Sequence, residues 1–187
     1  MNRRDALSAT AVFLGGVIIG GQAFLSGCKA EKTEMHWFTE ADLAFLDEVG
    51  ETILPATSKS PGAKAARIGS FMKTIVTDCY DSEEQRLFME GIESLKKLSQ
   101  QQYNRGFLQL NAKERNDLLT ALDREATLYG KNKLATDPEH YFSMIKQLTI
   151  WGYFTSEPGA TEALRFVPVP GRYEGCIDYK KGDPAWS

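Results

Sequence analysis

The chain has 187 residues and carries 22 basic against 25 acidic side chains, a formal net charge of −3. Once the amino-terminal segment described next is removed, about 160 residues remain, enough for one domain with one hydrophobic core. That mature part has 20 basic and 24 acidic residues, because Arg3, Arg4 and Asp5 lie before it. It has no cluster of Lys and Arg to neutralise phosphates, which excludes a nucleic-acid-binding protein.

Residues 1–27 have the composition of an export signal. Arg3 and Arg4 precede an apolar run from Ala11 to Leu25, as a basic n-region precedes an apolar h-region. A membrane-spanning helix needs roughly 20 residues to cross about 30 Å of hydrocarbon, so this run is too short for a typical permanent anchor. The segment therefore predicts a protein exported from the cytoplasm.

The signal ends in Leu25-Ser26-Gly27-Cys28, which resembles the bacterial lipobox. Small residues before the cysteine fit a peptidase cleft, and diacylglycerol alkylates the cysteine sulfur. Two or more acyl chains anchor a protein stably, whereas a single chain does so only marginally. We expect Cys28 to carry lipid and to hold the chain at a membrane, facing the periplasm. The alternative is an ordinary small apolar cysteine at the end of an uncleaved helix.

Two export routes fit this signal. The twin-arginine route carries folded proteins, and its motif matches here at Arg3, Arg4 and Leu7, although Ala6 stands where Phe is usual. The alternative is a general secretory signal that happens to contain two basic residues. Both routes deliver the chain to the same side of the membrane.

Residues 28–36 are mostly polar without periodicity, which indicates a tether, and the domain is expected to begin at Trp37.

Two amphipathic helices are expected at the start of the domain. Thr39 and Asp42 form a box-like cap for the first, and Pro55 ends it. Apolar residues at steps of three and four mark the two helices: Leu43, Leu46, Val49 and Ile53 in the first, and Ile68, Phe71, Met72, Ile75, Val76 and Cys79 in the second.

Capping signatures predict where the next two helices begin. Ser82 with Gln85 opens the third helix, whose last turns, residues 99–104, are polar and expected to fray. Asn111 with Glu114 opens the fourth. Their apolar stripes are Phe88, Ile92, Leu95 and Leu98, and then Leu118, Leu119, Leu122 and Ala126.

The fifth helix is expected to start with Asp137 as N-cap and Pro138 at the first helical position. Its apolar stripe is Tyr141, Ile145, Leu148 and Gly152, flanked by Met144 and Trp151. From Thr155 onward, Pro and Gly recur every few residues, which excludes a long helix, yet the segment is too apolar for a disordered tail. We expect ordered coil that lies on the helices or against a partner. The sequence thus predicts an all-α fold: about five amphipathic helices in one bundle-like domain, residues 37–187, with an irregular carboxy-terminal segment from 155.

The chain has three cysteines, and two of them remain to pair once Cys28 is assigned to lipid. In an oxidising compartment, Cys79 and Cys176 are expected to form a disulfide that closes a loop of about a hundred residues, worth up to about 4.7 kcal/mol. The alternative is two buried free thiols. There is no Cys-x-x-Cys-His motif, so the chain carries no c-type haem of its own.

No group of residues has the spacing that catalysis or metal binding requires. His36 falls in the tether, and His140 has no Cys, Asp, Glu or His at metal-ligand spacing, so it is expected to be an exposed or capping residue. No phosphate-binding glycine loop or nucleophile motif lies in the mature chain. We predict no catalytic, cofactor-binding or metal-binding residue, and no independent enzyme.

Aromatic residues are plentiful near the end of the chain. Such residues fill the domain's own core or form an interface, and the second possibility makes them candidates for contact with a partner. The candidate interface residues are Trp151, Tyr153, Phe154, Pro170, Tyr173 and Trp186.

Four stretches of the chain match one known protein family when taken together. They are the arginine-bearing signal; Phe38-Thr39-Glu40 with Ile53-Leu54-Pro55-Ala56-Thr57 and Pro61-Gly62-Ala63; the segment from Phe107 to Leu119; and Leu148-Thr149-Ile150-Trp151-Gly152-Tyr153-Phe154-Thr155-Ser156 with Val169-Pro170-Gly171.

On these stretches the chain resembles the gluconate 2-dehydrogenase subunit 3 family, small subunits of membrane-associated, FAD-dependent sugar and sugar-acid dehydrogenases. The resemblance implies that a large flavoprotein subunit holds FAD and oxidises the substrate, and that a cytochrome c subunit often passes electrons on. The small subunit has no redox centre; it binds the large one, helps it mature and takes it through the twin-arginine system.

A lipobox is not general in this family, so here the small subunit would itself be the membrane anchor. The alternative function is a stand-alone lipoprotein that binds another exported protein and has no oxidoreductase partner.

Overall fold

The computed structural model describes residues 38–169, 171–172 and 175–186. These residues belong to one compact unit, Trp37–Ser187. The predicted signal with Arg3 and Arg4, the lipid site Cys28 and the tether lie outside the described residues.

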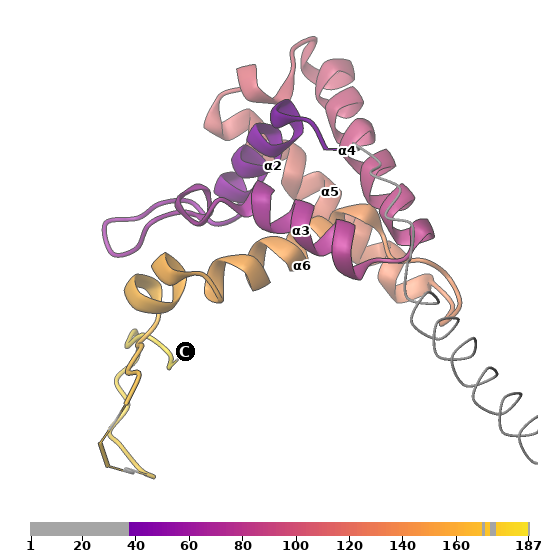
Figure 1. Ribbon diagram of the computed structural model, residues 1–187. Coiled ribbons are helices and arrows are strands. Elements are labelled where there is room, and N and C mark those ends of the chain that lie inside the picture. Colours follow the sequence, from indigo (N-terminus) through magenta and orange to yellow (C-terminus); the bar gives the residue numbers. More distant parts are fainter. Residues whose placement is uncertain (1–37, 170, 173–174, 187) are drawn as a thin grey trace, which may run out of the picture. The chain divides into compact units, whose positions relative to one another are not determined.

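Five α-helices and no strand occur among the described residues, which confirms the all-α prediction (Figure 1). Two 3-10 turns, η1 (Ala63–Ala66) and η2 (Phe107–Gln109), lie between α-helices, and the π-helical turn η3 (Gly159–Ala163) follows the last one. The α-helices are α2 (Glu40–Ile53), α3 (Ile68–Cys79), α4 (Ser82–Tyr103), α5 (Ala112–Asn132) and α6 (Tyr141–Phe154).

The predicted caps of α2 and α5 are confirmed. In α2, the backbone N–H of Asp42 donates to the Thr39 hydroxyl at 3.2 Å, and the N–H of Thr39 donates to the Asp42 carboxylate at 2.9 Å. The same reciprocal pair joins Asn111 and Glu114 at the start of α5. Each cap satisfies backbone donors that the first helical turn leaves without partners.

The predicted caps of α4 and α6 are wrong by one and three residues. Asp81 precedes α4, and its carboxylate accepts hydrogen bonds from the N–H groups of Glu83 and Glu84, so Ser82 is already the first helical residue. Before α6, Asp137 instead accepts the N–H of Leu134 in a turn, and His140 becomes the N-cap.

The polar end of α4 is also more ordered than predicted. Residues 99–103 remain helical, and Ser99 is fully buried. Its hydroxyl donates to the carbonyl of Arg105 at 2.9 Å, which satisfies the buried oxygen and fixes the turn after the helix.

The five apolar stripes meet in a single core. Each helix buries three or more apolar side chains. Among the most completely buried are Leu46 and Val49 of α2, Ile68 and Met72 of α3, Phe88, Ile92 and Leu95 of α4, Leu118 of α5, and Phe142, Ile145 and Leu148 of α6.

Glycine permits close approach at two helix contacts of α3, which packs against both α2 and α6 (Figure 1). A Cβ added at Gly69 would lie 2.4 Å from the backbone oxygen of Leu43 in α2. One added at Gly152 in α6 would lie 2.4 Å from the Phe71 ring of α3. The sequence pattern marked Gly152 as part of the α6 stripe, and the structure shows that its missing side chain is what admits Phe71.

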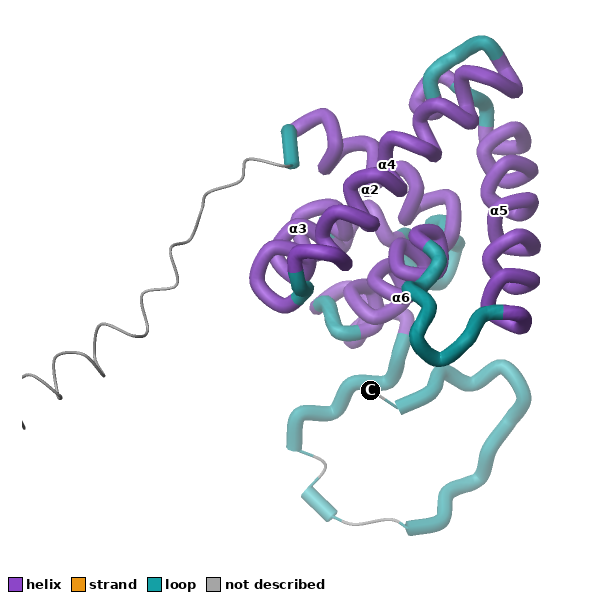
Figure 2. Tube along the Cα trace, turned by 90° about the vertical axis from the view of Figure 1, so that its right-hand side faces the viewer, coloured by secondary structure: helices purple, strands orange, loops and turns teal. Residues whose placement is uncertain are grey.

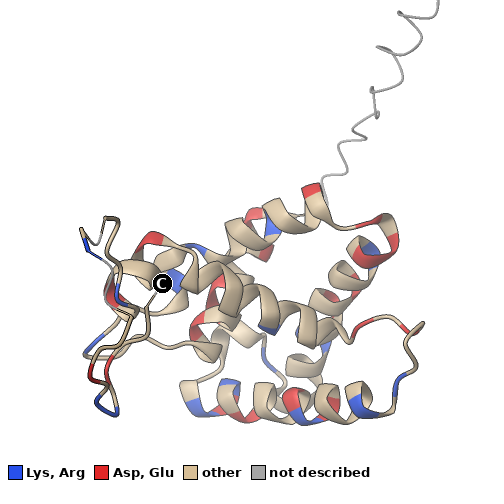
Figure 3. Cartoon of the chain, turned by 90° about the horizontal axis from the view of Figure 1, so that it is seen from below, with Lys and Arg blue, Asp and Glu red and all other residues tan. Residues whose placement is uncertain are grey.

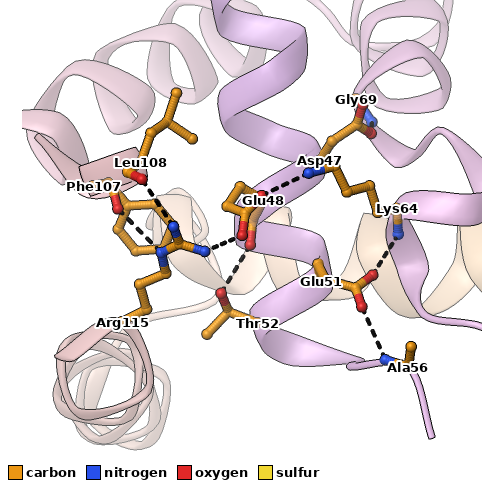
Figure 4. A network of polar contacts seen from close by, with 10 residues as sticks. All are labelled: Asp47, Glu48, Glu51, Thr52, Ala56, Lys64, Gly69, Phe107, Leu108 and Arg115. Carbon is orange, nitrogen blue, oxygen red and sulfur yellow. Dashed lines mark hydrogen bonds and ion pairs between the residues drawn. The ribbon is translucent and has the colours of Figure 1, made fainter. Parts of the chain in front are cut away.

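A network of polar contacts ties α2 to its neighbours (Figure 4). Glu48 accepts hydrogen bonds from Lys64 of η1, at 2.8 Å, and from Arg115 of α5. Arg115 also donates to the carbonyls of Phe107 and Leu108, at 3.2 and 2.9 Å. Although burial disfavours its charge, the Lys64 hydrogen bond and the Arg115 guanidinium hold the pKa of Glu48 below its usual value.

Candidate partner interface

The histidine in the described part of the chain, His140, has a structural role. His140 caps α6, since its Nδ1 accepts from the N–H of Phe142 at 3.2 Å, and its ring stacks on Tyr141 with 4.6 Å between centroids. His36 lies outside the described residues. Within the part of the chain that the structure describes, no cluster of His, Cys, Asp or Glu could hold a metal ion, and no helix has the length and apolarity to cross a membrane.

The end of α6 presents apolar side chains to solvent. Ile150, Trp151 and Phe154 are 40%, 50% and 37% exposed, and we call these three residues the α6 patch. The Trp151 ring meets the Phe71 ring edge-on, with 5.4 Å between centroids, so one side of the indole is fixed while the other stays open. Large aromatic residues held this way are typical anchors of protein interfaces.

Tyr153 does not belong to this surface, which corrects its assignment as a candidate interface residue. Its side chain is 3% exposed, and its hydroxyl donates to the carbonyl of Pro61 in the loop after α2. On a helix, position 153 turns inward where 150, 151 and 154 turn outward. Tyr153 therefore holds the loop against α6 and is unavailable to a partner.

Two hollows flank Trp151. The first has a volume of about 550 Å³ and lies between the start of α4, the loop from α5 to α6, and α6 itself. The second, of about 490 Å³, lies between α5 and α6 and includes Ile150. Both volumes are in the range of sites that enclose a small molecule or several side chains of a partner. We call the first the acidic hollow, because Asp81, Glu83, Glu84, Asp137 and Glu139 line it.

Residues after η3 form a loop whose two ends meet (Figure 2). The N–H of Arg165 donates to the carbonyl of Ala185 at 2.7 Å, and the Arg165 guanidinium lies 4.8 Å from the centroid of the Trp186 ring. Apolar side chains of this loop face solvent: Val169 is 81% exposed and Tyr179 is 76% exposed. We call residues 165–186 the terminal loop. Trp186 is thus exposed at its closure, while Pro170 and Tyr173 lie outside the described residues.

The predicted disulfide is not formed in the structure. Cys79 ends α3 and Cys176 lies on the terminal loop, and both are free, exposed thiols. Cys79 was expected on the apolar stripe of α3, but the last turn of the helix turns it to solvent. Since neither sulfur is buried, the alternative of two buried thiols is wrong as well.

Charges of both signs are spread over the helices (Figure 3). Many of them pair locally, as Lys113 with Asp117 and Arg86 with Glu90 do along single helices. Such exposed pairs are worth little individually and carry no sign of a phosphate-binding face.

The fold and these surfaces define a small all-α protein with the exposed apolar features of an interaction subunit. The family model described as gluconate 2-dehydrogenase subunit 3 matches residues 40–171, from the first residue of α2 into the terminal loop. The chain belongs to this family, and its class is that of an accessory subunit of a dehydrogenase complex. No curated protein matches the chain, and no solved structure matches it.

Sequence reasoning identified the end of α6 through its aromatic residues but missed Ile150 and the acidic hollow. The hollow combines two acidic runs, Asp81 to Glu84 and Asp137 to Glu139, which are more than fifty residues apart. The sequence did hold a signal for these two runs, since each lies at the start of a predicted helix. The packing that brings the two helix starts together could not be seen in the pattern.

Proposed function

We propose that this chain is a non-catalytic accessory subunit that binds the catalytic flavoprotein of a gluconate 2-dehydrogenase-type enzyme, assists its maturation and export, and anchors it at a membrane. The observation that carries this proposal is the match to subunit 3 over residues 40–171. The half-exposed Trp151 and the apolar terminal loop support it, because they provide surface for a protein partner.

The redox chemistry in this proposal belongs to the partner. FAD is held by the large subunit, and this chain supplies binding surface and position. A cytochrome c subunit that accepts the electrons is compatible with the same assembly.

Anchoring would come from lipid on Cys28 and export from the signal with Arg3 and Arg4. An acylated subunit can hold a partner that lacks an anchor of its own. We expect Cys28→Ser to move the chain and its flavoprotein from the membrane fraction to the soluble exported fraction. Retention of the variant in the membrane would contradict lipid anchoring while leaving partner binding intact.

The deciding experiment is purification of the full chain, tagged after Ser187, from membranes of the producing bacterium in mild detergent. The expected result is a second polypeptide in equal amount that carries flavin absorbance. Recovery of the chain without a flavoprotein would contradict the proposal. Recovery with a different exported protein would support the stand-alone binding module instead.

A further inference from the structure

We propose that the acidic hollow receives a segment of the catalytic subunit that presents a large apolar side chain flanked by Lys or Arg. This inference rests on the proposed function, because it names how the flavoprotein docks. It assigns the contact to one hollow of the α6 surface and states the chemistry of the occupant.

The floor of the acidic hollow is apolar. Met144 and Leu148 of α6 contribute to it while being 5% and 2% exposed, and the half-buried Leu87 of α4 adds to it. The open side of Trp151 forms one wall. A large apolar side chain that entered would remove its own surface and that of Trp151 from water, and this burial favours binding.

The edge of the hollow carries an excess of negative charge. Five carboxylates line it against a single cation, Lys133, which already pairs with Glu139. Among the described residues, the Glu83 side chain has no hydrogen-bond or ion-pair partner. Burial and the nearby Glu84 raise the pKa of Tyr80, so this phenol of the lining stays neutral and adds no negative charge of its own.

The start of α4 offsets part of this charge. A helix amino terminus carries roughly half a positive charge. The Asp81 carboxylate accepts hydrogen bonds from the first N–H groups of α4, and the Glu84 carboxylate accepts one from the N–H of Asp81. Because Glu139 pairs with Lys133, the carboxylates of Glu83 and Asp137 remain in excess. A hollow with low-dielectric walls and one sign of charge concentrates its field on what enters, so basic residues beside the apolar one are favoured.

The second hollow has no such preference for basic residues. Its carboxylate, Asp123, and its cation, Lys146, pair with each other at 2.6 Å. An occupant there would be selected by shape and apolarity alone. The charge complementarity therefore singles out the acidic hollow.

A pair of charge reversals tests the inference on the purified complex. Glu83 and Glu40 are both exposed acidic residues in the first turn of a helix, α4 and α2 respectively, so their replacement costs similar helix-dipole stabilisation. Glu83→Lys is expected to weaken flavoprotein binding about fivefold, and less at high salt. Glu40→Lys, the matched control outside the hollow, is expected to leave binding within about twofold of the wild type.

A photo-crosslinking amino acid at Thr136, an exposed residue that lines the acidic hollow and not the second one, gives an independent readout. It is expected to join a peptide of the flavoprotein with Lys or Arg beside a large apolar residue. Equal binding by the Glu83→Lys and Glu40→Lys variants, or a crosslinked peptide without basic residues, overturns the inference while the flavoprotein still co-purifies. If the wild-type chain recovers no flavoprotein, the proposed function fails and this inference falls with it.

Discussion

Two helical glycines illustrate how strongly a single residue depends on its neighbours. Gly152 faces the Phe71 ring, whereas Gly130 of α5 has nothing within 4 Å of an added Cβ. Gly152→Ala should overpack the contact of α3 with α6 and lower the free energy of unfolding by roughly 1–3 kcal/mol. Gly130→Ala should raise it by about 0.5–1 kcal/mol through helix propensity.

Chemical denaturation of the two variants measures both effects. If Gly152→Ala behaves like Gly130→Ala, Phe71 moves aside at no cost and the close contact does not matter for stability. Helical spacing alone does not distinguish the two positions, because the reason for a glycine at 152 lies in another helix.

Tyr153 is a candidate site residue whose role also depends on contacts that helical spacing does not reveal. The sequence grouped it with Trp151 and Phe154, since all three are aromatic and adjacent. Whether each is an interface or a core residue depends on helix rotation and on the Pro61 carbonyl, 92 residues away, that accepts the Tyr153 hydroxyl. Composition identified the right turn of the helix but did not separate the buried Tyr153 from the exposed Trp151 and Phe154.

At the scale of elements, the helices were predictable and some of their caps were not. Apolar periodicity located all five α-helices, because each must turn one stripe toward the core. Caps depend on one or two side chains, and before α4 both Asp81 and Ser82 have the right chemistry. The structure selects Asp81 because its carboxylate reaches the N–H groups of Glu83 and Glu84, both at 2.9 Å.

This choice of cap predicts different effects for neighbouring substitutions. Asp81→Ala should cost about 0.5–2 kcal/mol of unfolding free energy, since it removes the acceptor for two backbone donors. Ser82→Ala should change it by no more than about 0.5 kcal/mol, as for other exposed positions. Thermal or urea unfolding of the two variants checks this, and a larger loss in Ser82→Ala would restore Ser82 as the cap.

Glu48 predicts a pH dependence for the contacts of α2 with η1 and α5. The pKa of Glu48 is lowered from 4.5, so its charge stabilises the folded state above that value and this contribution is lost as the pH falls through the folded-state pKa. At neutral pH, Glu48→Gln should cost roughly 1–3 kcal/mol, because Arg115 and Lys64 lose a charged acceptor. The difference between variant and wild type should shrink steadily in acid.

Unfolding by urea at several pH values from neutral to strongly acidic measures this difference. Asp117→Asn is a suitable control, because Asp117 and its partner Lys113 have side chains 50% and 84% exposed, and its loss should cost no more than about 0.5 kcal/mol. A cost for Glu48→Gln that is the same at low and neutral pH would mean that the Glu48 charge does not hold the network together.

For the whole molecule, the sequence predicted the class of fold and the family more securely than the arrangement of surfaces. Five amphipathic helices in a chain of this size have few ways to bury their stripes other than one shared core. The acidic hollow, by contrast, depends on the relative placement of α4 and α6, which no local pattern encodes.

The terminal loop divides the molecule into a part that stabilises the fold and a part that is free for a partner. No residue after Ala163 belongs to the core or packs against it among the described residues, and the apolar side chains of the loop face solvent. A chain that ends at Leu164 should therefore keep its free energy of unfolding to within about 1 kcal/mol, the range typical of changes away from buried contacts.

The same truncation should sharply reduce co-purification of the flavoprotein, because exposed Phe166, Val169 and Trp186 would no longer be present to contact it. Circular dichroism and urea unfolding of the truncated chain, beside recovery of flavin from membranes, measure the two properties separately. A loss of several kcal/mol would show that the loop is part of the fold. If the truncated chain is fully stable and recovers as much flavoprotein as before, the terminal loop is not needed for binding. The α6 patch and its hollows would then be the binding surface, and Trp151 would be the residue to replace next.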